Sequence, residues 1–231
     1  MLPILVSAAM HGAVMHGAMH GGASRPELRQ TMQRVRRCTP RCNDDRSSNL
    51  ISSTLAWLDG WVIKEDLCPF AAAARRHTRV VVCYDEDVGA ETALLASELQ
   101  GLRDIEPTHP ATTLVIFPQR QSFAALMELQ SIAEALADAS YEEAPVQVLA
   151  FHPHAVYSDC LDAADWSTRS PLPLLHLLRG DDVDRAEARW VAQHEPGAAP
   201  SIQERNQAWL RGRGYKECAA AAALAAGVQP W

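Results

Sequence analysis

The segment "DLCPF", residues 66–70, places a cysteine directly before a proline. A residue that precedes proline is disfavoured in helical conformation, whereas proline itself suits the first position of a helix. The sequence therefore predicts that Cys68 caps a short helix that begins at Pro69. Amide groups at a helix start lower the pKa of a thiol, while nearby acids such as Glu65 and Asp66 raise it. Cys68 is thus either a nucleophile or redox thiol, or a small apolar residue packed at a corner.

Two histidines follow a predicted strand in the segment "FHPH". On an extended chain His152 and His154 point in the same direction, so they can ligate a metal ion together. Cys68 and His176 would complete such a site only if the fold brings them close. We favour the alternative without a metal, in which one histidine serves as an acid or base, or caps a turn.

A third chemical segment is "STRSPLPLLHLLR", residues 167–179. Proline at a helix start predicts a helix over its second half, which would place His176 and Arg179 on one helix face. Arg169 would lie in the loop before this helix. Two arginines and a histidine beside a helix start suit a carboxylate or phosphate. In the alternative interpretation, the arginines pair with the acidic residues that follow, such as Asp181 and Asp182.

Several common motifs are missing from the sequence. There is no GxGxxG, Walker loop, GxSxG, CxxC pair or HExxH, so the usual nucleotide, redox and zinc-protease sites are not indicated. We therefore expect no cofactor. A thioredoxin-type interpretation of Cys-Pro-Phe is weak because helical spacing, rather than a strand, precedes Cys68.

Three short apolar runs predict the strands that position these residues. They are "RVVVCY" from 79, "TTLVIF" from 112 and "VQVLAF" from 146. Runs that do not alternate with polar residues are typical of strands buried on both faces in a parallel sheet, and the spacing leaves room for crossover helices. The predicted fold class is α/β, with a small three-strand, mostly parallel sheet in α-β-α-β-α-β order, followed by C-terminal helices.

Apolar residues at helical spacing predict the helices. Ile51, Leu55, Leu58 and Val62 mark the first, with Ser52 or Ser53 as its cap. Similar spacing predicts helices over 95–102, 129–136 (after a Ser122 cap) and 183–190, a capping box at Ser201 and Glu204, and an Ala-rich end closed by Gly227.

Composition limits the classes of partner. The chain has 231 residues, 48% of them apolar, and a net charge of −7. This charge argues against nucleic acid and anionic membranes as general partners. No apolar run approaches the roughly 18 residues of a membrane span. Six irregularly spaced cysteines indicate reduced thiols inside a cell rather than a disulfide framework.

The N-terminal part differs from the rest of the chain. Residues 1–48 contain seven arginines and three acidic residues, together with a repeated Met-His-Gly unit. We expect a disordered, low-complexity basic tail, as in a transit peptide or a non-native upstream start. Residues 49–231 are expected to form a single domain, with 196–231 as a helical extension. The expected location is cytoplasmic, or mitochondrial or plastid if the tail is a transit peptide.

Taken together, "LCPFA", "AFHP" and "RSPLPLLHLLR" resemble the signature segments of the DUF1415 family. "WLDGWVIKEDLCPFA" resembles that family's opening helix, and the resemblance covers roughly residues 53–190. The family has no established activity, so the resemblance implies a domain and no reaction. Its recurrent residues carry over to Cys68, Pro69, Phe70, His152, Pro153, Arg169, Ser170, Pro171, Pro173, His176, Leu177 and Arg179. This sequence departs from the family pattern at Thr168, Leu172 and Gly180.

Three hypotheses follow. In the first, the protein is an enzyme acting on an anionic metabolite, with Cys68, His152 and His176 as catalytic residues. Arg169, Ser170 and Arg179 would bind the substrate. In the second, it is a non-catalytic anion-binding or protein-interaction domain, and Cys68 is a packed corner residue. In the third, it binds a metal or acts through a redox thiol. Oligomeric state is left open.

Overall fold

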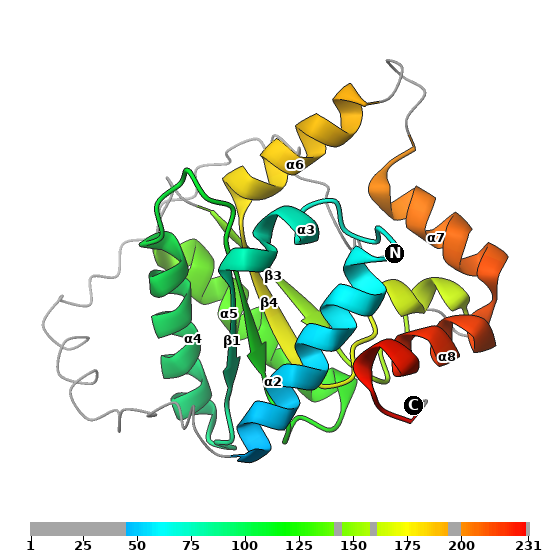
Figure 1. The fold of residues 1–231 in the computed structure, drawn as a ribbon. Helices are drawn as coiled ribbons and strands as arrows, with labels where there is room; N and C mark the ends of the chain where they lie inside the picture. Colours follow the sequence, from blue (N-terminus) through cyan, green and yellow to red (C-terminus); the bar gives the residue numbers. More distant parts are fainter. Residues whose placement is uncertain (1–44, 141–144, 158–160, 194–199, 230–231) are drawn as a thin grey trace, which may run out of the picture.

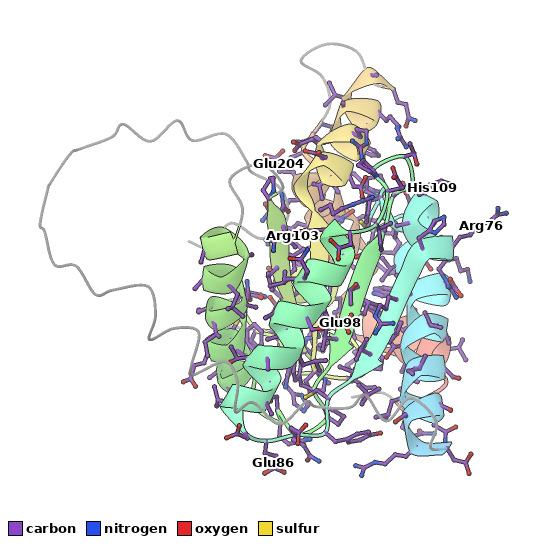
Figure 2. The ribbon with its side chains drawn as sticks, turned by 90° about the vertical axis from the view of Figure 1, so that its left-hand side faces the viewer. Arg76, Glu86, Glu98, Arg103, His109 and Glu204 are labelled. Carbon is purple, nitrogen blue, oxygen red and sulfur yellow. The ribbon has the colours of Figure 1, made fainter. Side chains whose placement is uncertain are left out.

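Four strands and two layers of helices form the structure, a computed structural model that describes residues 45–140, 145–157, 161–193 and 200–229. The strands are β1 (Thr78–Val82), β2 (Thr112–Ile116), β3 (Val146–Phe151) and β4 (Leu174–Arg179). Figure 1 shows the sheet at the centre, and Figure 2 shows α4 and α5 on one side of it with α2 on the other. The predicted mixed α/β class is confirmed.

The sheet has the order β1-β2-β4-β3. Strands β1 and β2 are parallel, whereas β4 is antiparallel to both β2 and β3. The prediction of a three-strand, mostly parallel sheet is therefore wrong. The three predicted strands do occupy the expected positions and run in one direction. A fourth, antiparallel strand separates β3 from β2.

This fourth strand is the segment for which we predicted a helix. Leu175 and Leu177 pack in the core on one sheet face, and Leu174 packs in the core on the other. A central strand needs apolar side chains on both faces, and this burial outweighs the helix propensity of leucine. His176 and Arg179, three residues apart on a strand, point to opposite faces and not to the same one.

The helices surround the sheet. In chain order they are α2 (Asp45–Trp57), the π-helix η2 (Leu58–Ile63), α3 (Ala71–Ala74), the 3₁₀-helix η3 (Arg75–His77), α4 (Val88–Arg103), α5 (Phe123–Ser140), the 3₁₀-helix η4 (Ala163–Ser167), α6 (Gly180–Ala192), α7 (Ile202–Arg213) and α8 (Tyr215–Ala226).

Local capping explains several of these boundaries. The Ser122 hydroxyl accepts a hydrogen bond from the Ala125 amide (3.1 Å), and Ser201 and Glu204 form the predicted capping box. Gly227 ends α8 in the left-handed conformation, with φ of 68°. These predictions are confirmed. The predicted cap at Ser52 or Ser53 is wrong because α2 begins at Asp45.

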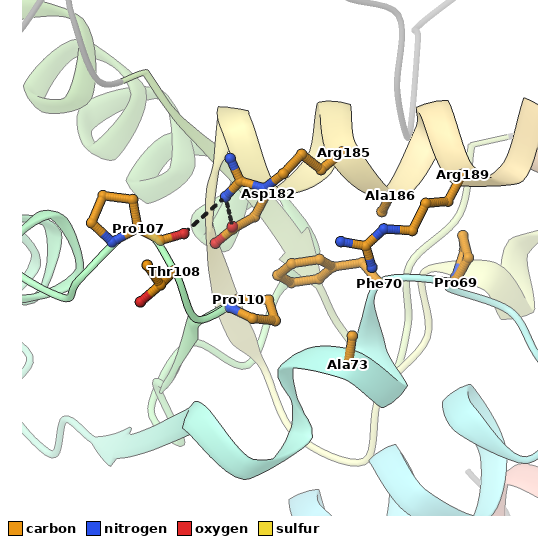
Figure 3. A pocket seen from close by; sticks show the side chains of 10 residues that line it. All are labelled: Pro69, Phe70, Ala73, Pro107, Thr108, Pro110, Asp182, Arg185, Ala186 and Arg189. Carbon is orange, nitrogen blue, oxygen red and sulfur yellow. Dashed lines mark hydrogen bonds and ion pairs between the residues drawn. The ribbon is translucent and has the colours of Figure 1, made fainter.

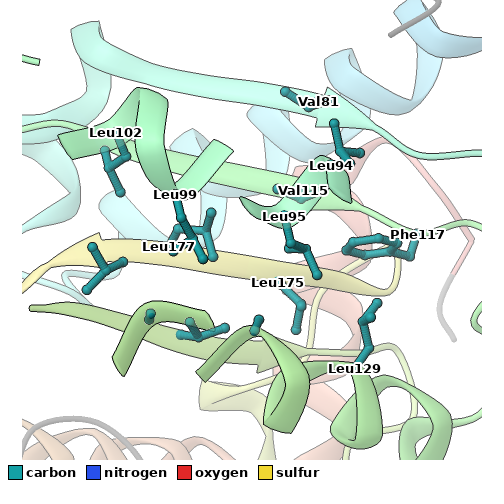
Figure 4. Close-up of a cluster of buried hydrophobic side chains, with 14 of the residues drawn as sticks. Val81, Leu94, Leu95, Leu99, Leu102, Val115, Phe117, Leu129, Leu175 and Leu177 are labelled. Carbon is teal, nitrogen blue, oxygen red and sulfur yellow. The ribbon is translucent and has the colours of Figure 1, made fainter. Parts of the chain in front are cut away.

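Two large apolar clusters fill the layers. One lies between the sheet and helices α4 and α5, and includes Leu95, Leu99 and Leu175 (Figure 4). The other lies on the opposite face, against α2, η2, α7 and α8, and includes Trp57, Trp61 and Leu174. Each sheet face thus packs against its own helical layer, as the sandwich arrangement requires. Among the described residues, no helix has the length and apolar character needed to cross a membrane.

Candidate functional site

A narrow cavity of about 50 Å³ lies between η2, the Cys68 segment and the sheet. Its lining is mainly apolar, with Cys68, His176 and Ser167 as polar exceptions. The lining residues are Trp57, Leu58, Trp61, Val62, Leu67, Cys68, Ala71, Leu114, Phe151, Ser167, Leu174, His176 and Leu178. An apolar cavity with a few convergent polar groups is the usual form of a small-molecule site.

The chain reaches Cys68 through a sharp reversal. Asp66 has a positive φ of 54° and follows the π-helix. Two residues later, the Cys68 carbonyl accepts a hydrogen bond from the Ala71 amide (3.1 Å). Helix α3 begins at Ala71 with Phe70 at its N-cap position, so the predicted helix start at Pro69 is wrong. Cys68 is the corner between two helices, as predicted, but it precedes the N-cap.

Burial decides the protonation of the Cys68 thiol. Removal from water raises its pKa, and the Asp66 charge adds to this effect. Hydrogen bonds from the Phe70 and Ala71 amides lower the pKa, but by less. The opposing effects noted in the sequence therefore resolve in favour of a protonated thiol at neutral pH.

His176 reaches the cavity from the centre of β4. Its Nε2 lies 2.6 Å from the Thr112 hydroxyl, and that hydroxyl donates its hydrogen to the Leu177 carbonyl (2.7 Å). Because the hydroxyl has one hydrogen, Nε2 must carry the imidazole proton and donate it, which leaves a lone pair on Nδ1. Burial lowers the pKa of His176 to about 4, so the ring is neutral at pH 7.

Two tryptophans supply donors beside the same cavity. Trp57 and Trp61 both line it, and both are almost fully buried. Within the described part of the chain, neither indole Nε1 has a hydrogen-bond partner. A buried donor without an acceptor is destabilising, and a ligand oxygen or nitrogen would satisfy it. Neither tryptophan was among the predicted site residues, although both stand in the apolar segment before Cys68.

The structure thus brings two of the predicted catalytic residues together. Cys68 and His176 line one cavity, with no hydrogen bond between them in the described ranges. His152 is placed elsewhere. Its Nδ1 accepts the His154 amide (3.0 Å), and its Nε2 lies 3.1 Å from the Arg120 carbonyl. Burial lowers the pKa of His152, and both ring nitrogens hold the turn after β3.

The predicted substrate-binding residues already donate hydrogen bonds to carbonyl groups of the protein itself. Arg169 donates from Nε to the Ala155 carbonyl (3.0 Å), and its guanidinium lies over the rings of Trp166 and Tyr215, 5.0 and 5.2 Å from their centroids. The Ser170 hydroxyl donates to the Leu172 carbonyl (2.6 Å).

Arg179 lies at the far end of β4 and holds the loop that precedes β2. It donates to Asp182 Oδ2 (2.7 Å), to the Ile105 carbonyl (2.7 Å) and to the His109 carbonyl. The alternative interpretation, pairing with a neighbouring acid, therefore describes Arg179 correctly. These three charge-assisted contacts to the chain itself make this arginine a structural clamp.

The metal hypotheses gain no support. Across residues 45–140, 145–157, 161–193 and 200–229, no group of three His, Cys, Asp or Glu side chains could hold a metal ion. The tail histidines, Cys38, Cys42 and Cys160 lie outside the described residues.

Comparison with known proteins gives one match. The model of a family described as "Protein of unknown function (DUF1415)" matches residues 49–220. No curated protein and no solved structure matches the chain. The matched region includes all four strands, the π-helix, Cys68 and His176. The chain therefore belongs to the DUF1415 family, as the three sequence segments had suggested.

Proposed function

We propose that this protein binds a small, uncharged, mainly apolar molecule in the cavity that Cys68 and His176 share. The observation that carries the proposal is that the Cys68 thiol and the His176 imidazole line the same otherwise apolar cavity. The indole donors of Trp57 and Trp61, which also line it, are unpaired. An ionised ligand would lose its hydration without gaining a charged partner among the lining side chains. A neutral ligand that accepts from the indoles and donates to His176 Nδ1 fits the cavity chemically.

The size of the cavity sets the scale of the ligand. About 50 Å³ holds only a few water-sized spheres. A ligand of more than a few heavy atoms therefore requires η2 or the Cys68 segment to move outward. Unusual helix geometry is frequent at functional sites, and η2 is a π-helix of six residues that supplies three of the lining side chains.

The test uses Cys68 as a reporter of the cavity. Neutral methyl methanethiosulfonate and its anionic 2-sulfonatoethyl analogue both transfer an S-alkyl group to a thiolate and release methanesulfinate. We expect the neutral reagent to modify Cys68 at least tenfold faster, after each rate is divided by that of the same reagent on the urea-unfolded chain. Peptide mass spectrometry assigns the modified residue, with buried Cys83 as internal control and Cys68→Ala as matched variant.

Equal normalised rates for the two reagents would contradict an apolar site, and so would modification of Cys68 no faster than that of Cys83. Once the reporter is established, small neutral compounds can be screened for protection of Cys68. A ligand of the cavity slows the modification and raises the melting temperature at the same time.

A second candidate function is catalysis by the thiol, with His176 as its base. It is favoured by the shared cavity and by the free lone pair inferred for Nδ1. The pH profile of Cys68 modification separates the candidates. Binding without catalysis predicts an inflection above 9.0, because burial raises the pKa from that ordinary value. A catalytic thiol predicts an inflection well below this value that His176→Gln removes.

A further inference from the structure

A second and larger pocket, of about 260 Å³, lies on the other side of the Cys68 segment, between α3, the loop before β2 and α6. Figure 3 shows its lining: Pro69, Phe70, Ala73, Pro107, Thr108, Pro110, Asp182, Arg185, Ala186 and Arg189. None of these residues lines the Cys68–His176 cavity. The two pockets are therefore distinct sites that share the segment 68–70 as a wall.

One wall of this pocket carries two arginines. Arg185 and Arg189 are four residues apart on α6, so their side chains lie on one helix face. Arg185 donates to Asp182 Oδ1 and to the Pro107 carbonyl (3.3 Å). Among the described residues, Arg189 has neither a hydrogen bond nor an ion pair. Figure 3 shows its side chain extending from α6 over the pocket toward the Phe70 ring.

The one acidic side chain in this lining is already neutralised. Asp182 is buried, and its Oδ2 accepts from Arg179 Nε (2.7 Å) and from the Ala111 amide (3.2 Å). Its Oδ1 accepts from Arg185. The lining therefore holds two arginines against one carboxylate, and Arg179 from outside the lining also pairs with that carboxylate.

The rest of the lining is mainly apolar. Phe70 and the three prolines at 69, 107 and 110 contribute flat or rigid apolar surfaces. Such surfaces favour a ring or a short hydrocarbon, while guanidinium groups form paired hydrogen bonds with carboxylates and phosphates. The combination suits a molecule with an anionic group at one end and an apolar body at the other.

We propose that this pocket binds a small organic anion, with a carboxylate or phosphate group on Arg189 and Arg185 and an apolar body against Phe70 and the prolines. The site differs from the one predicted from sequence, because Arg169 and Arg179 are occupied by the protein itself. It also goes beyond the cavity proposed above, so either site can fail without the other.

The experiment is an NMR titration of the ¹⁵N-labelled full chain with phenyl phosphate, benzoate, inorganic phosphate and neutral benzyl alcohol. Binding is monitored through the chemical shifts of the backbone amides and the arginine Nε groups. We expect saturable binding of at least one organic anion at low millimolar concentration or tighter, which is about the range for ligands of this size. The organic anion should bind more tightly than inorganic phosphate or benzyl alcohol. Comparing the affinities of phenyl phosphate and benzoate shows which anionic group the pocket prefers.

Two pairs of variants make the test specific. Arg189→Gln should weaken binding about tenfold or more, since it removes a charge-assisted contact. Arg76→Gln removes the same charge from an exposed neighbouring segment and should leave binding unchanged; Figure 2 shows Arg76 extending away from the protein. Ala73→Glu places a negative charge in the lining and should also weaken binding, whereas Ala72→Glu, which is also exposed but lies outside the lining, should not.

Three results would overturn the proposal. The first is the absence of saturable binding for both organic anions. The second is an equal loss of affinity in Arg189→Gln and Arg76→Gln, which would indicate non-specific attraction to positive charge. The third is inorganic phosphate binding as tightly as phenyl phosphate, which would remove the role of the apolar wall.

Discussion

The imidazole of His176 is held neutral by its position in the sheet. Burial lowers its pKa to about 4, and its Nε2 hydrogen is used by Thr112. A neutral histidine and a protonated thiol in one cavity offer hydrogen-bonding groups to a ligand, and they differ from the thiolate–imidazolium pair of a resting cysteine enzyme. For this reason, we propose ligand binding rather than catalysis as the first candidate function.

The same burial predicts a pH dependence of stability. Between pH 6.5 and about 4 the unfolded chain protonates this histidine while the folded protein does not. Stability due to His176 is therefore complete above pH 6.5 and is lost as the pH falls, by about 2 kcal/mol at pH 5. In urea titrations at pH 7 and pH 5, His176→Gln should reduce the difference in unfolding free energy. An unaltered difference in His176→Gln would contradict the assignment.

Arg179 provides a second residue-level prediction. It is buried and bonds Asp182 and the backbone of the loop before β2. Replacing it with Met leaves buried carbonyls and a carboxylate with fewer donors, so we expect a loss of about 3 kcal/mol in urea unfolding. Arg179→Lys should recover little, because one ammonium group cannot reproduce the planar set of donors. An effect no larger than that of Arg76→Gln would show that the clamp is unimportant.

At the scale of elements, the π-helix η2 sets the position of the cavity wall. It continues α2 without a break, and α8 packs closely against it. A Cβ added at Gly60 would lie 2.9 Å from the Ala225 Cβ and 3.3 Å from its Cα. Glycine at this position therefore allows η2 and α8 to approach, while Trp57 and Trp61 face the core.

This close contact gives a prediction with an internal control. Gly60→Ala should destabilise the protein by about 1–3 kcal/mol because the helices must separate. Gly101→Ala, at an exposed position of helix α4 with no atom within 4 Å of the added Cβ, should stabilise it by about 0.5–1 kcal/mol. Thermal and urea unfolding measure both. A neutral or stabilising effect of Gly60→Ala would mean that η2 and α8 adjust freely to the added methyl group.

At the scale of the whole molecule, the sheet is completed late in the chain. Strand β4 is central, pairing with β2 on one side and β3 on the other. A chain that ends at Pro173 lacks this strand, and β3 then has no neighbour in the sheet. We expect such a chain to show no cooperative urea transition, whereas the full chain unfolds cooperatively. A cooperative transition in the shortened chain would show that β1, β2 and their helices fold independently.

The sequence could predict the elements more readily than their arrangement. Uninterrupted β-branched runs identified β1, β2 and β3, and capping residues identified the starts of α5 and α7. These signals are local, since they depend on propensity and on hydrogen bonds between near neighbours. The segments around Cys68, His152 and His176 likewise indicated the family that the family model confirms.

Only the tertiary structure decided which of these residues share a site. The segment "LLHLL" suits a buried helix or a buried strand equally well, and its insertion between β2 and β3 settled the choice. That insertion turned His176 toward Cys68 and Arg179 away from it. Burial likewise decided the charge of Cys68 and His176, because desolvation depends on every surrounding element and not on sequence neighbours. The amino-acid sequence determined the chemical groups available to this protein, and long-range packing determined which of them meet and in which protonation state.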